Sequence, residues 1–176
     1  MYYESDHFRA VHASWDDENI TRLRELSDNQ RLTDDLLHQS AKKGTVLYDT
    51  VDETLQSKEM ELPNGLTFYD KDGTARREVR IKWWENPKGH TIRSLAVGSS
   101  GNLPDHPVET SGSSNHSYYC EEEKPVFFGH YWLRGNPSLY RHNICCLDYS
   151  VVKKGKLVAY RFDGEQHQAD EKLVFV

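Results

Sequence analysis

The spacing of apolar residues changes along this 176-residue chain, and that change most limits the folds open to it. Between about residues 16 and 58, apolar side chains recur at helical spacing. From residue 62 onward, short apolar runs alternate with polar residues or lie between turns. We therefore expect a mixed fold (α+β or α/β), with a helical N-terminal third and mostly β-strands in the C-terminal two thirds.

Residues that can start a helix divide the helical third into three. Asp16 or Asp17 can cap a first helix and Thr33 a second, while a third begins at Thr45, just after Gly44. The apolar residues expected to face the core from the second and third helices are Leu36, Leu37, Leu47, Tyr48, Val51 and Leu55.

Short apolar or alternating runs predict the strands. They lie at residues 8–12, 66–69, 77–83, 125–129, 143–147, 156–160 and 172–176. The second and third of these runs flank a turn at 70–73, so we expect them to pair as a hairpin. The stretch 98–123 is rich in Ser, Gly, Asn and His, which predicts a flexible loop or a loop close to a site.

Charge and composition restrict the partners and the compartment. The formal net charge of −6 argues against a nucleic-acid partner, which would need a basic face. No apolar run reaches the length of a membrane helix, and the N-terminus lacks a signal-peptide pattern, so we expect no membrane partner. The cysteines Cys120, Cys145 and Cys146 cannot all pair within the chain, which favours the reducing cytoplasm.

Two of the nine histidines occupy positions where a fold of this kind gathers functional side chains. His12 and His130 each follow a short apolar strand, immediately before the chain leaves the sheet. Strand ends hold the backbone while loops leave space for a ligand, and a neutral imidazole there is a good metal ligand. The alternative is a pair of buried histidines whose ring nitrogens bond to backbone carbonyls.

The motifs around these histidines resemble those of a known enzyme family. VHASWD at 11–16 and FFGHYW at 127–132 are similar to two late motifs of bacterial calcineurin-like metallophosphoesterases, in the branch related to protein serine/threonine phosphatases and symmetrical diadenosine tetraphosphatases. Further segments match in the same order over nearly the whole chain: LPNG at 62–65, DKDG at 70–73, RIKWW at 80–84, CLDYS at 146–150 and LVAYRFDGE at 157–165.

The resemblance implies two packed β-sheets flanked by helices, with a pair of divalent ions at the strand ends. In this family a metal-activated water hydrolyses phosphate esters. The resemblance implies that His12 and His130 bind the second metal, which is manganese, iron or zinc. It places Asp148 in a structural strand rather than among the metal ligands. Arg134, just after the second motif, is a candidate to bind the phosphate of a phosphorylated substrate as a bidentate donor.

Three earlier motifs of the family do not occur in this sequence: D-x-H, GDxxDRG and GNHE. They supply the other metal ligands and the catalytic histidine. We therefore expect residues 1–176 to form a single incomplete domain, the C-terminal half of a metallophosphoesterase, with no catalytic residue of its own and no activity alone.

A half-domain of this kind leaves unpaired strand edges and uncovered apolar faces. We expect either the N-terminal half, supplied as a partner, or self-association of the chain to cover them. The alternative function is a non-enzymatic remnant or interaction protein that keeps the half-fold.

Overall fold

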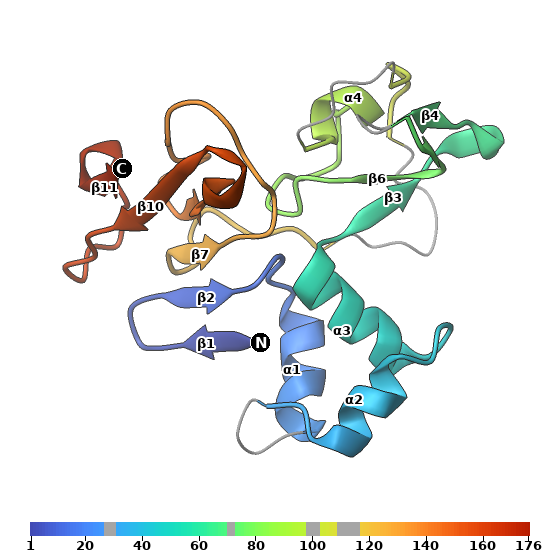
Figure 1. The fold of residues 1–176 in the computed structure, drawn as a ribbon, viewed down its shortest axis with the longest axis horizontal. Coiled ribbons are helices and arrows are strands. Elements are labelled where there is room, and N and C mark those ends of the chain that lie inside the picture. Colours follow the sequence, from blue (N-terminus) through green and yellow to red (C-terminus); the bar gives the residue numbers. More distant parts are fainter. Residues whose placement is uncertain (27–30, 70–72, 98–102, 109–116) are drawn as a thin grey trace. The chain divides into compact units, whose positions relative to one another are not determined.

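The computed structural model describes residues 1–26, 31–69, 73–97, 103–108 and 117–176. They group into two compact units: the first unit is residues 1–56 and 120–176, and the second unit is residues 57–119. Both units combine helices with short strands, so the expected mixed α+β fold is confirmed (Figure 1). The calcineurin-like sandwich and the single domain over residues 1–176 stay predictions.

Two sheets form the strand framework of the first unit. One has the order β1-β2-β7-β8, in which β1 is antiparallel to β2, and β2, β7 and β8 run parallel. The other is antiparallel, with the order β11-β10-β9. In chain order the elements are β1 (Tyr2–Glu4), β2 (Arg9–Val11), α1 (Asp17–Leu26), α2 (Asp34–Ser40), α3 (Val46–Gln56), β7 (Val126–Phe128), β8 (Ile144–Cys146), β9 (Asp148–Tyr149), a 3-10 turn (Val151–Lys153), β10 (Lys156–Tyr160), a second 3-10 turn (Asp170–Lys172) and β11 (Leu173–Phe175).

The three helices begin where their capping residues predict. Asp16 accepts the backbone N–H of Asn19 at 2.9 Å, and Thr33 accepts that of Leu36 at 3.3 Å. Thr45 accepts the N–H of Tyr48 at 3.2 Å. Each side chain satisfies an amide that the first helical turn leaves without a carbonyl partner, which explains why these polar residues mark the helix starts.

The buried faces of α2 and α3 differ from the expected apolar stripes. Leu37 is 56 % exposed, whereas α3 buries Thr50 and Thr54 beside Val51. The expectation that Leu37 faces the core is therefore wrong. The Thr54 hydroxyl donates to the Thr50 carbonyl at 2.7 Å, so this threonine can be buried without an unsatisfied hydroxyl.

The core of the first unit lies on both faces of its four-stranded sheet. Every residue of β7 and β8 is buried. Phe127 and Cys145, paired in register, pack with Tyr149, Val158 and Leu173. Because successive side chains of a strand alternate between faces, the buried neighbours of Phe127 and Cys145 are covered on the opposite face. β7 and β8 are thus covered on both faces, which fixes the positions of their carboxyl ends.

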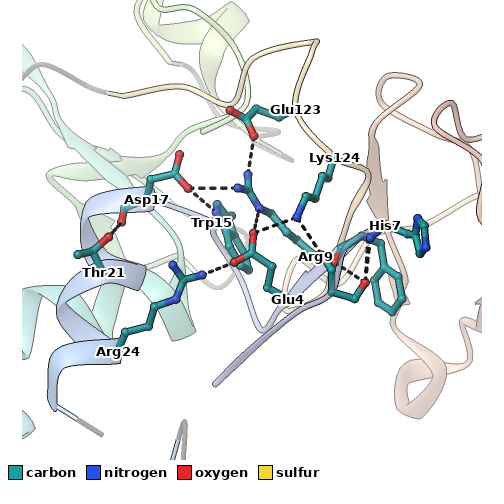
Figure 2. Close-up of polar contacts among 11 residues, drawn as sticks. Glu4, His7, Arg9, Trp15, Asp17, Thr21, Arg24, Glu123 and Lys124 are labelled. Atoms are coloured by element: carbon teal, nitrogen blue, oxygen red, sulfur yellow. Dashed lines mark hydrogen bonds and ion pairs between the residues drawn. The ribbon is translucent and has the colours of Figure 1, made fainter. Parts of the chain in front are cut away.

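Arg9 of β2 joins several segments of the first unit through charge (Figure 2). Its guanidinium lies 2.8 Å from the carboxylates of both Glu4 and Glu123. It also lies 3.8 Å from the carboxylate of Asp17, and its central carbon is 4.8 Å from the ring centre of Trp15. The Arg9 side chain is only 13 % exposed, so its charge is largely removed from water. These contacts compensate for the hydration free energy that the guanidinium loses.

Stability at low pH tests this network through Glu4. Burial raises the pKa of the Glu4 carboxyl, but the hydrogen bond and charge of Arg9, with the charges of Arg24 and Lys124, outweigh burial and hold it below its ordinary value of 4.5. A lowered folded-state pKa means that the Glu4 charge stabilises the fold above pH 4.5 and loses that effect as the pH falls through the folded value.

We expect Glu4→Gln to lower the free energy of unfolding by about 1 kcal/mol at neutral pH. The difference in the free energy of unfolding between the wild type and Glu4→Gln should then shrink as the pH drops below 4.5. Urea titrations from neutral pH down to about pH 3 measure this difference. A gap that stayed constant over the range would contradict a charge-based role for Glu4 and would point to packing instead.

The core of the second unit is one cluster of hydrophobic side chains. The buried members are Leu62, Val79, Ile81, Ile92, Leu95, Ala96 and Leu103. The elements of this unit are β3 (Glu59–Glu61), a 3-10 turn (Pro63–Gly65), β4 (Phe68–Tyr69), β5 (Ala75–Arg76), β6 (Glu78–Arg80) and α4 (Ile92–Leu95). Among the residues that the structure describes, no helix combines the length and apolarity that a membrane crossing needs.

Strand pairing in the second unit differs from the expected hairpin of 66–69 with 77–83. β4 pairs with β5, while β6 pairs with β3. The prediction missed β3 because only one of its three residues, Met60, is apolar, and Met60 finds its partner in Val79 across the sheet. Within the expected turn, residues 70–72 lie outside the described residues, whereas Gly73 has the positive φ (77°) that a turn requires.

Only part of the expected loop at 98–123 can be compared with the structure. Residues 98–102 and 109–116 lie outside the described residues. Of the rest, Leu103 and Tyr119 are buried, and the Tyr119 ring packs edge-on against Trp83 with centroids 5.7 Å apart. Leu103 and Tyr119 therefore lie in the interior of the second unit, whereas Tyr118 and Cys120 are exposed.

Candidate functional site

The parallel strands β2 and β7 bring His12 and His130 together. Ala10 lies opposite Phe127 in the register, so both strands reach their carboxyl ends at one edge of the sheet. Just beyond that edge, the backbone N–H of Gly129 donates to the His12 carbonyl at 2.9 Å. The two imidazole rings have centroids 5.2 Å apart and planes at 55°. Two residues separated by more than a hundred positions thus form one side-chain pair.

The two histidines of the pair differ in exposure. His12 is exposed and His130 is half-buried. The alternative of two buried, internally satisfied histidines is therefore wrong for His12. A metal at about 2 Å from a ring nitrogen lies roughly 3 Å from the ring centre, so two imidazoles on one tetrahedral ion have centroids roughly 5 Å apart. The observed spacing fits two ligands of a single ion.

The backbone around His130 is held in an uncommon conformation. His130 has φ 74° and Trp132 has φ 51°. Both values lie in the left-handed region of backbone conformation, which residues other than glycine rarely adopt. Asp148 supports this turn: its carboxylate accepts the N–H of Trp132, and its carbonyl accepts the N–H of Leu133, at 3.1 and 2.9 Å. Strain of this kind persists only when surrounding contacts enforce it, and it is common at functional sites.

Asp148 is engaged by backbone groups on both of its carboxylate oxygens. Besides the N–H of Trp132, it accepts the N–H of Ser150 at 3.1 Å. It lies in β9, as expected for a structural residue. Within the described ranges, no group of three or more His, Cys, Asp or Glu side chains is placed to hold a metal ion. His12 and His130 therefore fit part of a metal-ligand set.

The buried cysteines next to this edge are poor nucleophiles. Cys145 and Cys146 are fully buried, and burial raises the pKa of both thiols, that of Cys146 to about 12. A thiol with so high a pKa stays protonated at neutral pH, whereas catalysis requires the thiolate. Covalent cysteine chemistry at these two positions is therefore disfavoured.

Arg134, the candidate phosphate ligand, is exposed. It borders a depression of about 340 Å³ whose other basic lining residues are Lys153, Lys154 and Lys156. The sequence indicated Arg134 as a phosphate ligand, but Lys153, Lys154 and Lys156 were not among the candidate site residues. The run KKGK at 153–156 was the available signal for these lysines.

No family model, curated protein or solved structure matches the chain. The resemblance to metallophosphoesterases therefore rests on the sequence motifs alone, among them those at 11–16 and 127–132. What the site can do follows from its own residues and geometry.

Proposed function

We propose that His12 and His130 are two ligands of a divalent-metal site that hydrolyses phosphate esters. The observation that carries this proposal is the pairing of two imidazoles, one exposed and one half-buried, at neighbouring parallel strand ends, with ring centroids 5.2 Å apart. The motif resemblance supplies the reaction class. On this proposal the chain is the C-terminal part of a calcineurin-like sandwich, and the remaining ligands come from a segment that carries the D-x-H, GDxxDRG and GNHE motifs.

Four residues of this chain have defined roles in the proposal. His12 and His130 hold the ion, which is manganese, iron or zinc, and Asp148 holds the backbone turn that carries His130. Arg134 attracts the phosphate group of the substrate. When bound, the metal lowers the pKa of a coordinated water and neutralises charge on the phosphoryl oxygens.

Two imidazoles alone make a weak site for ions of this class, which take further ligands and favour oxygen among them. We therefore expect the purified chain to bind Zn²⁺ weakly and to hydrolyse no p-nitrophenyl phosphate with Mn²⁺. Activity should appear when a segment carrying the D-x-H, GDxxDRG and GNHE motifs is fused upstream, and it should be lost again with His12→Ala.

Zn²⁺ titration calorimetry at about pH 7.5 tests the ligand role directly. We expect His12→Ala and His130→Ala each to weaken Zn²⁺ binding by more than about tenfold, because each removes a direct ligand. His38→Ala is a control in the same unit, since His38 is an exposed histidine of α2 and is no part of the proposed site. This variant should bind Zn²⁺ like the wild type.

Three results would overturn the proposal or a part of it. Zn²⁺ binding that is unchanged in the double variant His12→Ala/His130→Ala would exclude the pair as ligands. A fused protein that binds Zn²⁺ but hydrolyses nothing would leave a metal-binding remnant, which is the non-enzymatic alternative. Manganese-dependent turnover by the chain alone would contradict the need for further ligands.

A further inference from the structure

Four basic side chains surround one depression in the first unit. It has a volume of about 340 Å³, and its basic lining residues are Arg134, Lys153, Lys154 and Lys156. None of the described residues that line it is acidic. The chain as a whole carries a formal net charge of −6, so this concentration of positive charge runs against the overall balance.

The lysines of the depression are oriented by neutral groups. The Lys153 ammonium lies 3.7 Å from the ring centre of Trp132. Lys156 donates to the side-chain oxygen of Asn136 at 2.8 Å, and its ammonium lies 4.1 Å from the ring centre of Phe175. Within the part of the chain that the structure describes, no carboxylate forms an ion pair with any of the four basic residues. Their charges therefore remain available to an anion.

The loop that carries the lysines has its conformation set by its own backbone. Ser150 and Lys154 have φ 58° and 61°, and the N–H groups of Lys153 and Gly155 both donate to the Ser150 carbonyl, at 2.8 and 3.0 Å. The Ser150 hydroxyl donates to the carbonyl of Leu133 at 3.2 Å, which ties the loop to the segment before Arg134. A loop already ordered in this way loses little conformational entropy when it binds a ligand.

We propose that this depression binds a polyphosphate group, such as pyrophosphate or the phosphate chain of a nucleotide. The guanidinium of Arg134 suits bidentate contact with phosphate oxygens, and lysines act as point charges toward the same group. Four uncancelled positive charges in one concave site match two or three linked phosphates better than a single one. The proposal goes beyond the hydrolytic function and does not depend on a metal ion at His12 and His130.

An anionic membrane surface is the competing occupant, because the exposed tip of the same loop carries Val151 and Val152, 51 % and 92 % exposed. We favour the small anion because the charges line a hollow rather than a flat face. A hollow of this kind can partly enclose a discrete phosphate ligand.

Pyrophosphate titration calorimetry in a buffer with EDTA and constant ionic strength tests the proposal without any metal. We expect Lys154→Asn and Arg134→Gln each to weaken pyrophosphate binding by about tenfold or more. Asparagine tolerates the left-handed backbone of Lys154, so this variant should fold normally. Lys43→Asn, which removes a charge from an exposed site in the same unit, should bind like the wild type.

Tryptophan fluorescence locates the binding site. Trp132 is 50 % exposed, whereas Trp15, Trp83 and Trp84 are buried, so an anion at Lys153 should change the emission of Trp132 and leave the others unaffected. In Trp132→Phe, pyrophosphate should still bind while the emission change disappears. ATP and phosphatidylserine vesicles, titrated separately, distinguish a nucleotide from a membrane surface.

Three outcomes would overturn the proposal. Pyrophosphate affinities of Lys154→Asn and Arg134→Gln equal to that of Lys43→Asn would exclude the depression. If sulfate and pyrophosphate bound with equal affinity, the depression would attract anions only through diffuse electrostatics and would have no preference for linked phosphates. Binding to phosphatidylserine vesicles without binding to pyrophosphate or ATP would assign the surface to membranes.

Discussion

Asn143→Ala is expected to lower the free energy of unfolding by about 3 kcal/mol, because this fully buried side chain organises a loop through hydrogen bonds. Its side-chain nitrogen lies 2.9, 3.2 and 3.1 Å from the carbonyl oxygens of Cys120, Glu121 and Glu123. Its side-chain oxygen accepts from Arg141 at 2.9 Å. Alanine would remove all of these bonds and leave a cavity as well.

Asn143→Asp separates hydrogen bonding from size. Aspartate keeps the volume and the acceptor toward Arg141, but it places an oxygen where the two amide N–H groups face three carbonyl oxygens. We expect this variant to be at least as unstable as Asn143→Ala. The exposed Asn136 gives the control, since Asn136→Ala should change stability by less than about 1 kcal/mol.

Urea unfolding followed by circular dichroism measures the effect of the Asn143 variants, and hydrogen exchange locates it. The N–H of Val126 bonds to the carbonyl of Asn143 at 2.9 Å, so its exchange should accelerate in Asn143→Ala and Asn143→Asp. If Asn143→Asp were as stable as the wild type, the hydrogen bonds that the Asn143 amide donates would add nothing to the stability of the fold.

Gly155→Ala is expected to destabilise the first unit by about 3 kcal/mol or more for a steric reason. A Cβ atom at this position would lie 1.8 Å from the carbonyl oxygen of Tyr149 and 2.6 Å from that of Ser150. Both contacts are with backbone, which cannot move aside as a flexible side chain can. The turn between β9 and β10 would have to open, and overpacking of this kind is costly.

Two other glycines provide graded controls for Gly155→Ala. Gly164 has φ 95°, but no atom lies within 4 Å of where a Cβ would stand, so Gly164→Ala should cost about 1 kcal/mol of backbone strain. Gly129 has only ordinary contacts, the nearest at 3.6 Å from Asp148, and Gly129→Ala should be close to neutral. Urea midpoints rank the three variants. Equal losses of unfolding free energy in Gly155→Ala and Gly164→Ala would contradict the steric explanation.

The two proposed sites share one structural support. The carboxylate of Asp148 accepts backbone N–H groups from Trp132, beside the histidine pair, and from Ser150, at the start of the lysine loop. The same residue therefore holds a turn of each site. This arrangement explains why Asp148 lies close to the proposed metal site while its carboxylate is occupied by backbone groups.

Local sequence patterns predicted much of this framework. The capping residues Asp16, Thr33 and Thr45 begin the helices as expected, and the apolar runs at 125–129 and 156–160 contain β7 and β10. These features depend on residues within a few positions of one another. The errors arose where burial overrides pattern, as at Leu37, which is exposed although it lies in a helical apolar stripe.

The sequence by itself determined the mixed α+β character and the positions of His12 and His130 at the ends of strands, because periodicity and strand boundaries are local properties. Only the tertiary structure decided that β2 and β7 are parallel neighbours, which brings the two imidazoles together, and that Arg134 lies beside the lysines of a later loop. Pairing between distant segments depends on how the chain reverses and packs, and local hydrophobic periodicity carries no information about that choice.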